Sequence, residues 1–129
     1  MVVAVFVRRL KEGVSFEEFE RGWEADEGYG VPARVVNAVS LEDPRDVLSI
    51  GFVGISAAAM KSAAASTKEH DQGRHDRIDE LIESTELKAM YELRSEHDFS
   101  EEPRAIEPES QGSIFAGVTS WGMDQQSRR

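Results

Sequence analysis

Apolar and polar positions alternate in distinct patterns up to about residue 100, and these patterns predict an α+β domain. Strands are expected where β-branched residues concentrate, and helices where apolar residues recur every three or four positions. The expected strands cover Val2–Arg9, Ala33–Leu41, Val47–Ile55 and Leu87–Leu93. The expected helices begin at Ser15 and at Ser56, each placed where it can cap the helix N-terminus. The order β-α-β-β-α-β is that of a ferredoxin-like fold with a four-stranded antiparallel sheet.

The first expected helix has the clearer signals. Ser15 is followed three residues later by Glu18, which is typical of a capping box. Phe16, Phe19 and Trp23 then form one apolar stripe on an otherwise acidic segment. This spacing predicts that the stripe packs against the sheet. The second helical pattern is alanine-rich, is interrupted near a glycine, and resumes before the last strand.

The strand Val2–Arg9 is apolar on both of its alternating faces, so it needs cover on both sides. Right-handed crossovers place both helices on the same side of the sheet. The opposite side then needs another cover, and a second copy of the chain is the simplest one. Between the second and third strands, Asp43-Pro44 is typical of a tight turn, which predicts a hairpin.

Beyond residue 100 the character of the chain changes. Residues 1–100 are expected to form the domain, and residues 101–129 an acidic linker followed by a C-terminal arm. Within that arm, residues 113–121 are apolar and rich in residues that favour strands. They predict either an additional strand on the same sheet or an arm that reaches a partner chain.

Charge and cysteine content narrow the possible partners. Lysine and arginine number 15 against 25 acidic residues, a net charge of −10. Such a surface repels nucleic acids and anionic lipids, so neither is expected as a partner. The absence of cysteine excludes thiolate chemistry and is typical of a cytoplasmic protein. The apolar run Met1–Val7 is too short for a signal peptide, and its basic residues follow it instead of preceding it.

The chain resembles the dimeric α+β barrel superfamily of ferredoxin-like proteins. The resemblance rests on VVAVFVRR, SFEEFERGWEADEGYG, ARVVNAVSLEDPRDVLSIGFVGI and RHDRIDELIESTELKAMYELRSEHDF, and it covers about residues 1–100. The superfamily includes proteins like the antibiotic-biosynthesis monooxygenases, EthD-like proteins, proteins like muconolactone isomerase, and stress-responsive barrels. The resemblance implies a homodimer with a ligand cavity between sheet and helices in each subunit. It supplies no catalytic residues.

All three histidines precede an aspartate, in His70-Asp71, His75-Asp76 and His97-Asp98. On a helix, Asp71 and His75 would share a face, whereas His70 and His75 would point in different directions. Two ligands do not make a metal site. A solvated, charged helix is therefore favoured over a metal site, and no metal is expected.

A small organic ligand is the other candidate. His75 has a side chain whose pKa suits proton transfer at neutral pH, and alternation along the last strand predicts that Tyr91 points inward beside it. The residues expected to bind the ligand are Phe19, Trp23, Phe52 and His70. Each of these side chains also has an ordinary structural explanation.

Two functions remain open from the sequence. In the first, the protein binds or transforms a small, largely apolar molecule without a cofactor, as an oxygenase or isomerase would. In the second, it is a non-catalytic dimeric module whose apolar surface serves only assembly. A cavity lined by polar groups would favour the first, and a solid core the second.

Overall fold

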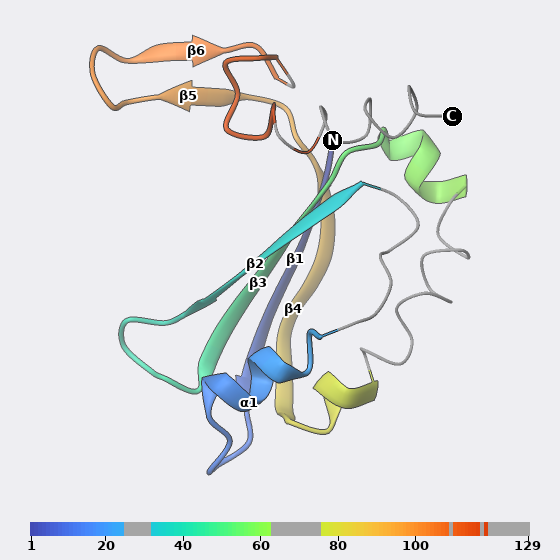
Figure 1. Ribbon diagram of the computed structural model, residues 1–129, viewed down its shortest axis with the longest axis vertical. Coiled ribbons are helices and arrows are strands. Elements are labelled where there is room, and N and C mark those ends of the chain that lie inside the picture. Colours follow the sequence, from blue (N-terminus) through green and yellow to red (C-terminus); the bar gives the residue numbers. More distant parts are fainter. Residues whose placement is uncertain (25–31, 63–75, 109, 117, 119–129) are drawn as a thin grey trace.

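The computed structural model describes residues 1–24, 32–62, 76–108, 110–116 and 118 (Figure 1). The strands and the first helix are β1 (Val2–Leu10), α1 (Phe16–Arg21), β2 (Ala33–Val39), β3 (Asp46–Val53), β4 (Ile82–Glu92), β5 (Glu96–Asp98) and β6 (Arg104–Ile106). Residues 57–62 and 76–79 are also helical. No helix among these described segments is long and apolar enough to cross a lipid bilayer.

The main sheet has four strands in the order β2-β3-β1-β4, and every neighbouring pair is antiparallel. The predicted α+β class and the four-stranded antiparallel sheet are therefore confirmed. β1 lies inside the sheet, where Val5 pairs with Ile50 of β3 and with Ala89 of β4. A separate two-stranded sheet, β5-β6, forms from the residues that follow β4.

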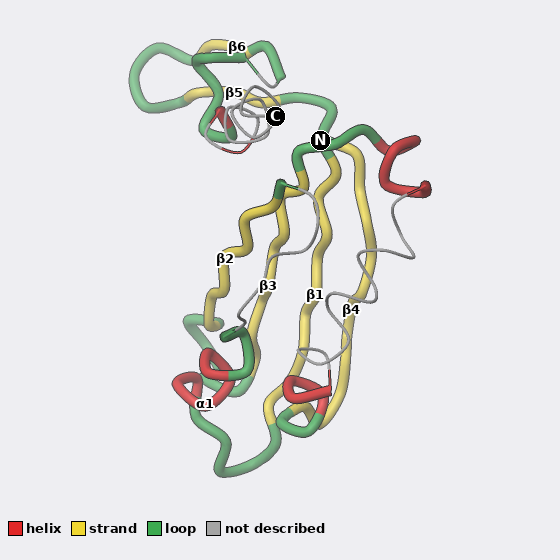
Figure 2. Tube along the Cα trace, turned by 45° about the vertical axis from the view of Figure 1, so that its right-hand side comes forward, coloured by secondary structure: helices red, strands yellow, loops and turns green. Residues whose placement is uncertain are grey.

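The register defines two faces of the main sheet. The inner face is the one that α1 and the helical residues 76–79 cover, near one end of the sheet (Figure 2). It carries Val2, Ala4, Phe6, Arg8 and Leu10 of β1 and the paired residues Val47, Ser49, Gly51 and Val53 of β3. The outer face carries the alternate residues, Val3, Val5 and Val7 of β1 with Leu48, Ile50 and Phe52 of β3.

The core lies at one end of the inner face. Leu10, Phe19, Val47 and Ile78 are fully buried there and contact one another. The predicted cap of α1 is confirmed, since the Glu18 backbone N–H donates to the Ser15 hydroxyl at 3.2 Å. The predicted cap at residue 56 is also confirmed, because its hydroxyl accepts a backbone N–H three residues later at 3.0 Å. Both helices therefore begin in the folded chain at the residues that the local sequence predicts.

The turn between β2 and β3 forms as its sequence predicts. The Asp46 backbone N–H donates to the Asp43 carbonyl at 3.0 Å, and the Ser40 backbone N–H donates to the Asp46 carbonyl at 2.9 Å. The Asp43 carboxylate accepts the Arg45 backbone N–H at 2.9 Å and pairs with Arg9 at 2.9 Å. These two donors lower the pKa of Asp43 below its usual value.

The start of the last strand of the main sheet differs most from the sequence prediction. Strand β4 begins at Ile82 and not at Leu87, so the helical pattern through Ile78 and Leu81 ends earlier than expected. The reason is tertiary: Ile82 pairs with Leu10, and the Leu81 carbonyl accepts the Lys11 backbone N–H at 2.9 Å. Pairing with β1 outweighs the local helical pattern.

The C-terminal region is more ordered than a linker. The residues predicted to be loosely held form part of the β5–β6 hairpin, in which Arg104 pairs with Asp98 at 3.0 Å. The strand expected over 113–121 was wrong for residues 113–116 and 118, which adopt bend, turn and helical conformations. The Glu96 carboxylate fixes this conformation, because it accepts the Ser113 hydroxyl at 2.6 Å and the Ile114 backbone N–H at 3.1 Å. Residues 119–121 lie outside the described chain.

Candidate functional site

A buried arginine surrounded by aromatic rings is the most unusual chemical feature of the inner face. Arg8 is only 3% exposed, although it carries a full positive charge. Its guanidinium carbon lies 4.8 Å from the ring centroid of Phe6, 5.7 Å from that of Phe19 and 6.0 Å from that of Trp23. Removing a charge from water is costly, and aromatic faces offset part of that cost through cation–π attraction.

A line of hydrogen bonds leads from this arginine to the protein surface. Arg8 Nη2 donates to Ser49 Oγ at 3.2 Å, and Ser49 Oγ donates to Asn37 Oδ1 at 2.6 Å. Asn37 Nδ2 then donates to Glu20 Oε1 at 3.2 Å. The sheet register brings Asn37 opposite Ser49, and α1 supplies Glu20. Three strands and one helix therefore fix the orientation of the arginine side chain.

Trp23 contributes a second buried donor to the same cluster. Its indole Nε1 is shielded from solvent, and no acceptor among the described residues lies within hydrogen-bonding distance. The ring meets Phe19 edge-on, with centroids 6.2 Å apart and planes at 82°. Buried indole N–H groups in proteins nearly always have an acceptor. A buried donor beside a guanidinium is suited to an oxygen atom that carries partial or full negative charge.

Small residues form the sheet surface beyond this cluster. Gly51 pairs with Ala4, next to the pair formed by Ser49 and Phe6. A Cβ atom at Gly51 would lie 3.7 Å from Ala4 Cβ and 3.8 Å from Val35 Cγ2, which are ordinary contacts. On β1 and β3 the side chains are therefore short here, in the stretch that α1 does not reach (Figure 2), whereas β4 contributes Met90 opposite Ala4.

The structure brings some predicted site residues together and separates others. Phe19 and Trp23 lie together beside Arg8, as the apolar stripe predicts. Phe52 lies on the outer face, where its ring centroid is 4.6 Å from that of Phe115. The sheet therefore separates Phe52 from the aromatic cluster. His70 and His75 lie outside the described residues.

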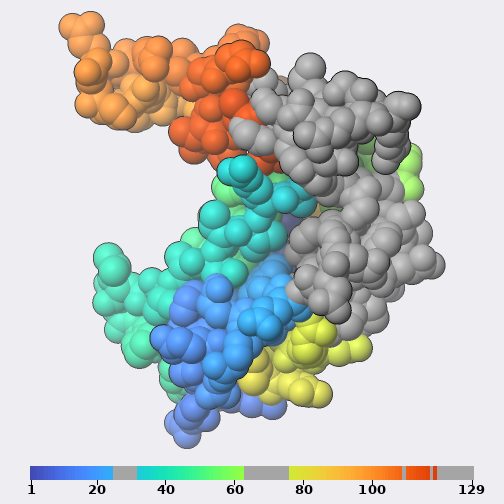
Figure 3. Space-filling view, in the orientation of Figure 1, coloured from blue at the N-terminus to red at the C-terminus, as the bar shows by residue number. Residues whose placement is uncertain are grey.

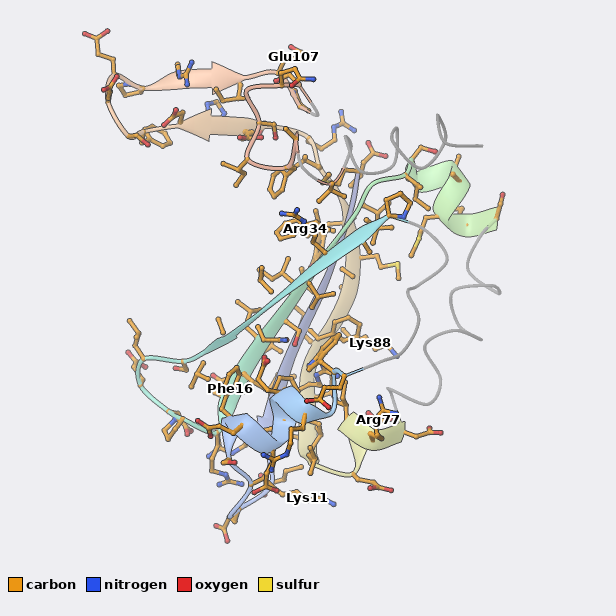
Figure 4. The ribbon with its side chains drawn as sticks, in the orientation of Figure 1. Lys11, Phe16, Arg34, Arg77, Lys88 and Glu107 are labelled. Atoms are coloured by element: carbon orange, nitrogen blue, oxygen red, sulfur yellow. The ribbon has the colours of Figure 1, made fainter. Side chains whose placement is uncertain are left out.

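The inward orientation expected for Tyr91 was wrong. Tyr91 pairs with Val3, so it belongs to the outer face, and it is 52% exposed. The alternate residue Lys88 pairs with Phe6 and faces the inner side. In Figure 4, Lys88 and the outer-face residue Arg34 extend to opposite sides of the sheet. Alternation correctly separates the two sets of β4 residues but cannot indicate which set meets the helices.

His97 is the histidine that lies among the described residues. His97 is exposed and stacks on Phe99 with ring centroids 6.2 Å apart. Its neighbour Asp98 is engaged by the Ser100 backbone N–H at 2.9 Å and by Arg104. These hydrogen bonds, that of Ser100 first, lower the pKa of Asp98 to about 2. Among the described residues, no group of three or more histidine or acidic side chains could hold a metal ion.

Arg8, Ser49 and Asn37 were not singled out from the sequence, although a signal is present. Arg8 has the same parity as Ala4 and Phe6, so it belongs to an otherwise apolar face of its strand. Ser49 and Asn37 likewise interrupt strands of apolar residues. The sequence interpretation assigned none of these three residues to a binding site.

Comparison with known proteins gives no further guide to the site. No protein-family model, curated protein or solved structure matches this chain at a significant level. The chemistry of the inner face is therefore the basis for a functional proposal.

Proposed function

We propose that this protein is a homodimer that binds a small, largely apolar organic molecule with an acceptor oxygen on the inner face of each sheet. The observation that carries the proposal is the cluster in which the Trp23 ring, whose N–H is buried, lies with its centroid 6.0 Å from the buried guanidinium carbon of Arg8. The rings of this cluster offer apolar contact to a flat ligand. The indole N–H of Trp23 selects for oxygen, because a hydrocarbon would leave this donor without an acceptor.

The fold proposed for this function is the ferredoxin-like βαββαβ arrangement of dimeric α+β barrels. The strand order β2-β3-β1-β4 supports it, since β1 is parallel to β2 across β3, and β3 is parallel to β4 across β1. Each parallel pair is linked by a connection that includes described helical residues. The same arrangement leaves one sheet face for a second copy.

The outer face supports the dimer. Val36 and Tyr91 are 50% and 52% exposed, and their neighbours on β1 and β3 are uncharged. Apolar sheet faces of this extent are rarely left open to water. A chain with a net charge of −10 also approaches its own copy with less repulsion through this face, where β1 and β3 present apolar residues and β2 presents the cation Arg34. Two such faces would pack like the sheets of a sandwich.

The proposed site is suited to polarising a carbonyl or stabilising an enolate, which cofactor-free isomerisation and oxygenation both require. A positive guanidinium and a neutral N–H donor favour negative charge on a ligand oxygen. The chain of hydrogen bonds to Asn37 keeps Arg8 in place while the ligand changes. A general base would be needed for proton transfer, and His75 stays the candidate that the sequence offers.

Two probes of the same shape test the binding proposal. Native mass spectrometry and isothermal titration would compare 1-tetralone, which has a carbonyl oxygen, with tetralin, which has none. We expect the ketone to bind about tenfold more tightly, the effect of one net hydrogen bond in a dry site. Trp23→Phe keeps an aromatic ring but removes the N–H, so it should abolish most of this preference.

Tyr91→Phe, which removes a hydroxyl from an aromatic side chain on the outer face, is the control and should keep the preference. Failure of both probes to bind would contradict the small-molecule function and leave the non-catalytic dimer. If the Trp23→Phe variant preferred the ketone over tetralin as strongly as the wild-type protein does, Trp23 would not be a donor to the ligand.

The dimer is tested by placing a charge on the outer face. Val5→Asp should give a monomer by size-exclusion chromatography with light scattering, because a carboxylate in a sheet–sheet interface would be buried without a partner. Ala58→Asp adds the same charge at an exposed helical position and should leave the dimer intact. A wild-type monomer at micromolar concentration would exclude this assembly.

A further inference from the structure

The backbone on both sides of Trp23 is held by an arginine from a distant part of the chain. The backbone N–H groups of Gly22, Trp23 and Glu24 donate to carbonyls three residues earlier, at 3.0, 3.0 and 3.2 Å, so the chain makes one tight turn after α1. The last carbonyls of a helix have no donor within it. Arg77 Nη2 supplies one, because it donates to the Gly22 carbonyl at 3.4 Å and to the Glu24 carbonyl at 2.5 Å.

Arg77 reaches these carbonyls from a segment that is itself anchored to the sheet. It is one of the helical residues 76–79, which lie beside α1 (Figure 4). The next residue, Ile78, is only 1% exposed and belongs to the same core cluster as Phe19. The Leu81 backbone N–H donates to the Ile78 carbonyl at 2.9 Å, and β4 begins one residue later. The side chain of Arg77 is therefore exposed, but the backbone that carries it is fixed.

Gly22 allows α1 and the helical residues 76–79 to come close together. A Cβ atom at Gly22 would lie 3.1 Å from Ile78 Cγ1 and 3.1 Å from the Phe19 carbonyl oxygen, which is tighter than most Cβ contacts. In the space-filling view the surface of α1, in blue, meets that of the residues from 76 onward, in yellow (Figure 3). This contact brings Arg77 within hydrogen-bonding distance of the chain around Trp23.

The position of the Trp23 indole N–H depends on this support. The ring contacts Phe19 edge-on and lies with its centroid 6.0 Å from the guanidinium carbon of Arg8, and neither contact is a hydrogen bond of the indole. Among the described residues the indole nitrogen has no acceptor that would hold it. A displacement of about 1 Å is enough to break a hydrogen bond to a ligand oxygen, so the backbone that carries the ring must be fixed.

We infer that Arg77 is a positioning residue, which holds the chain on both sides of Trp23 so that the indole N–H meets the oxygen of a bound ligand. The inference rests on the small-molecule site proposed above and adds to it a residue on which its selectivity for oxygen depends. Arg77 acts through Trp23 and not on the ligand. A guanidinium suits this role, because its N–H donors lie in a rigid plane and one group can serve two carbonyls.

The ketone and hydrocarbon probes test this role. Arg77→Met keeps a long side chain but removes the donors, so the preference for 1-tetralone over tetralin should fall from about tenfold to about twofold, with little change in tetralin affinity. Arg21→Met removes an exposed arginine from the last turn of α1 and should keep the preference. Arg77→Lys keeps a charged donor and should recover at least half of it. A role in fold stability alone would leave the ratio of the two affinities unchanged.

The protein without ligand offers a second measurement. The chain has two tryptophans, so its ¹H–¹⁵N spectrum should contain two indole N–H signals, and Trp23→Phe identifies the one from Trp23. Hydrogen exchange of this N–H with water should accelerate about tenfold in Arg77→Met, because the tight turn after α1 opens more often without its donor. In Arg21→Met the exchange rate should stay that of the wild-type protein.

The outcomes separate this inference from the proposed function. An unchanged ketone preference or an unchanged Trp23 indole exchange rate in Arg77→Met, in a protein whose preference Trp23→Phe abolishes, would overturn the role of Arg77 alone. A wild-type protein that binds neither probe would contradict the proposed site and the role of Arg77 with it. Circular dichroism checks the fold of each variant. If Arg77→Met does not fold, Arg77→Gln replaces it, since the shorter side chain cannot reach both carbonyls.

Discussion

The two faces of the main sheet use alternate residues of the same strands, but they differ in what completes them. The inner face contains the fully buried residues Leu10, Phe19 and Val47, and its polar side chains are linked by hydrogen bonds. The outer face is as apolar, but Val36 and Tyr91 are half exposed. Near α1 the inner face is thus covered by helices of the chain itself, whereas the outer face keeps half-exposed apolar side chains among the described residues.

The difference shows that polar residues in a strand can indicate the inner face better than apolar residues do. Arg8 and Ser49 are tolerated inside because aromatic rings and hydrogen bonds compensate for their lost hydration. An interface that must form between separately folded chains gains most from apolar residues alone. The outer face of β1, with three valines, fits that requirement.

The largest expected effect is the difference in stability lost when a phenylalanine is removed from the inner side or from the outer side of the sheet. Phe19→Ala should lower the free energy of unfolding by about 3–5 kcal/mol, because it leaves a cavity in the core. Phe52→Ala should cost about half of that or less, since Phe52 is only partly buried in one chain. Urea denaturation in the monomeric Val5→Asp background measures both. Equal losses would mean that the outer face is packed as well as the inner one.

A smaller effect compares two adjacent arginines. Arg8→Ala should destabilise the fold by about 3 kcal/mol, through lost cation–π contacts and a charged hydrogen bond to buried Ser49. Arg9 pairs with Asp43 and Glu83 while its side chain is 36% exposed, so Arg9→Ala should cost only about 0.2–1 kcal/mol. Thermal unfolding of both variants at low and high salt distinguishes the two contributions. Salt should reduce the stability lost in Arg9→Ala and leave that in Arg8→Ala unchanged, since salt weakens only the exposed ion pairs. A greater loss for Arg9→Ala would reverse the assignment of the faces.

Much of the sheet could be predicted because local signals agree with its tertiary contacts. The valines of β1, the cap at Ser15 and the turn at Asp43 each specify their conformation within a few residues. Tyr91 could not be oriented, because its strand alternates but either set of residues could meet the helices. The start of β4 at Ile82 depends on pairing with β1, which lies far away in the chain.

The candidate site was predicted only in part for a related reason. Phe19 and Trp23 share an apolar stripe that the helical period reveals. Arg8 joins them only because α1 folds back over β1. The spacing of residues within either element does not predict this contact. The C-terminal turn depends in the same way on Glu96, whose carboxylate is 18 residues from the backbone N–H of Ile114 that it accepts.

The smallest effect concerns the hairpin beside the outer face and its response to pH. The pKa of Asp98 is lowered from 3.8 to about 2, first by the Ser100 backbone N–H and then by Arg104. A lowered pKa means that the ionised carboxylate favours the folded hairpin, so its contribution is complete above pH 3.8 and disappears as the pH falls through about 2. Carboxyl NMR shifts should titrate with that midpoint, and amide exchange at Ser100 should accelerate over the same range. Asp98→Asn should remove this pH dependence, while a midpoint near 3.8 in the wild-type protein would show that the hairpin turn is not held by this carboxylate.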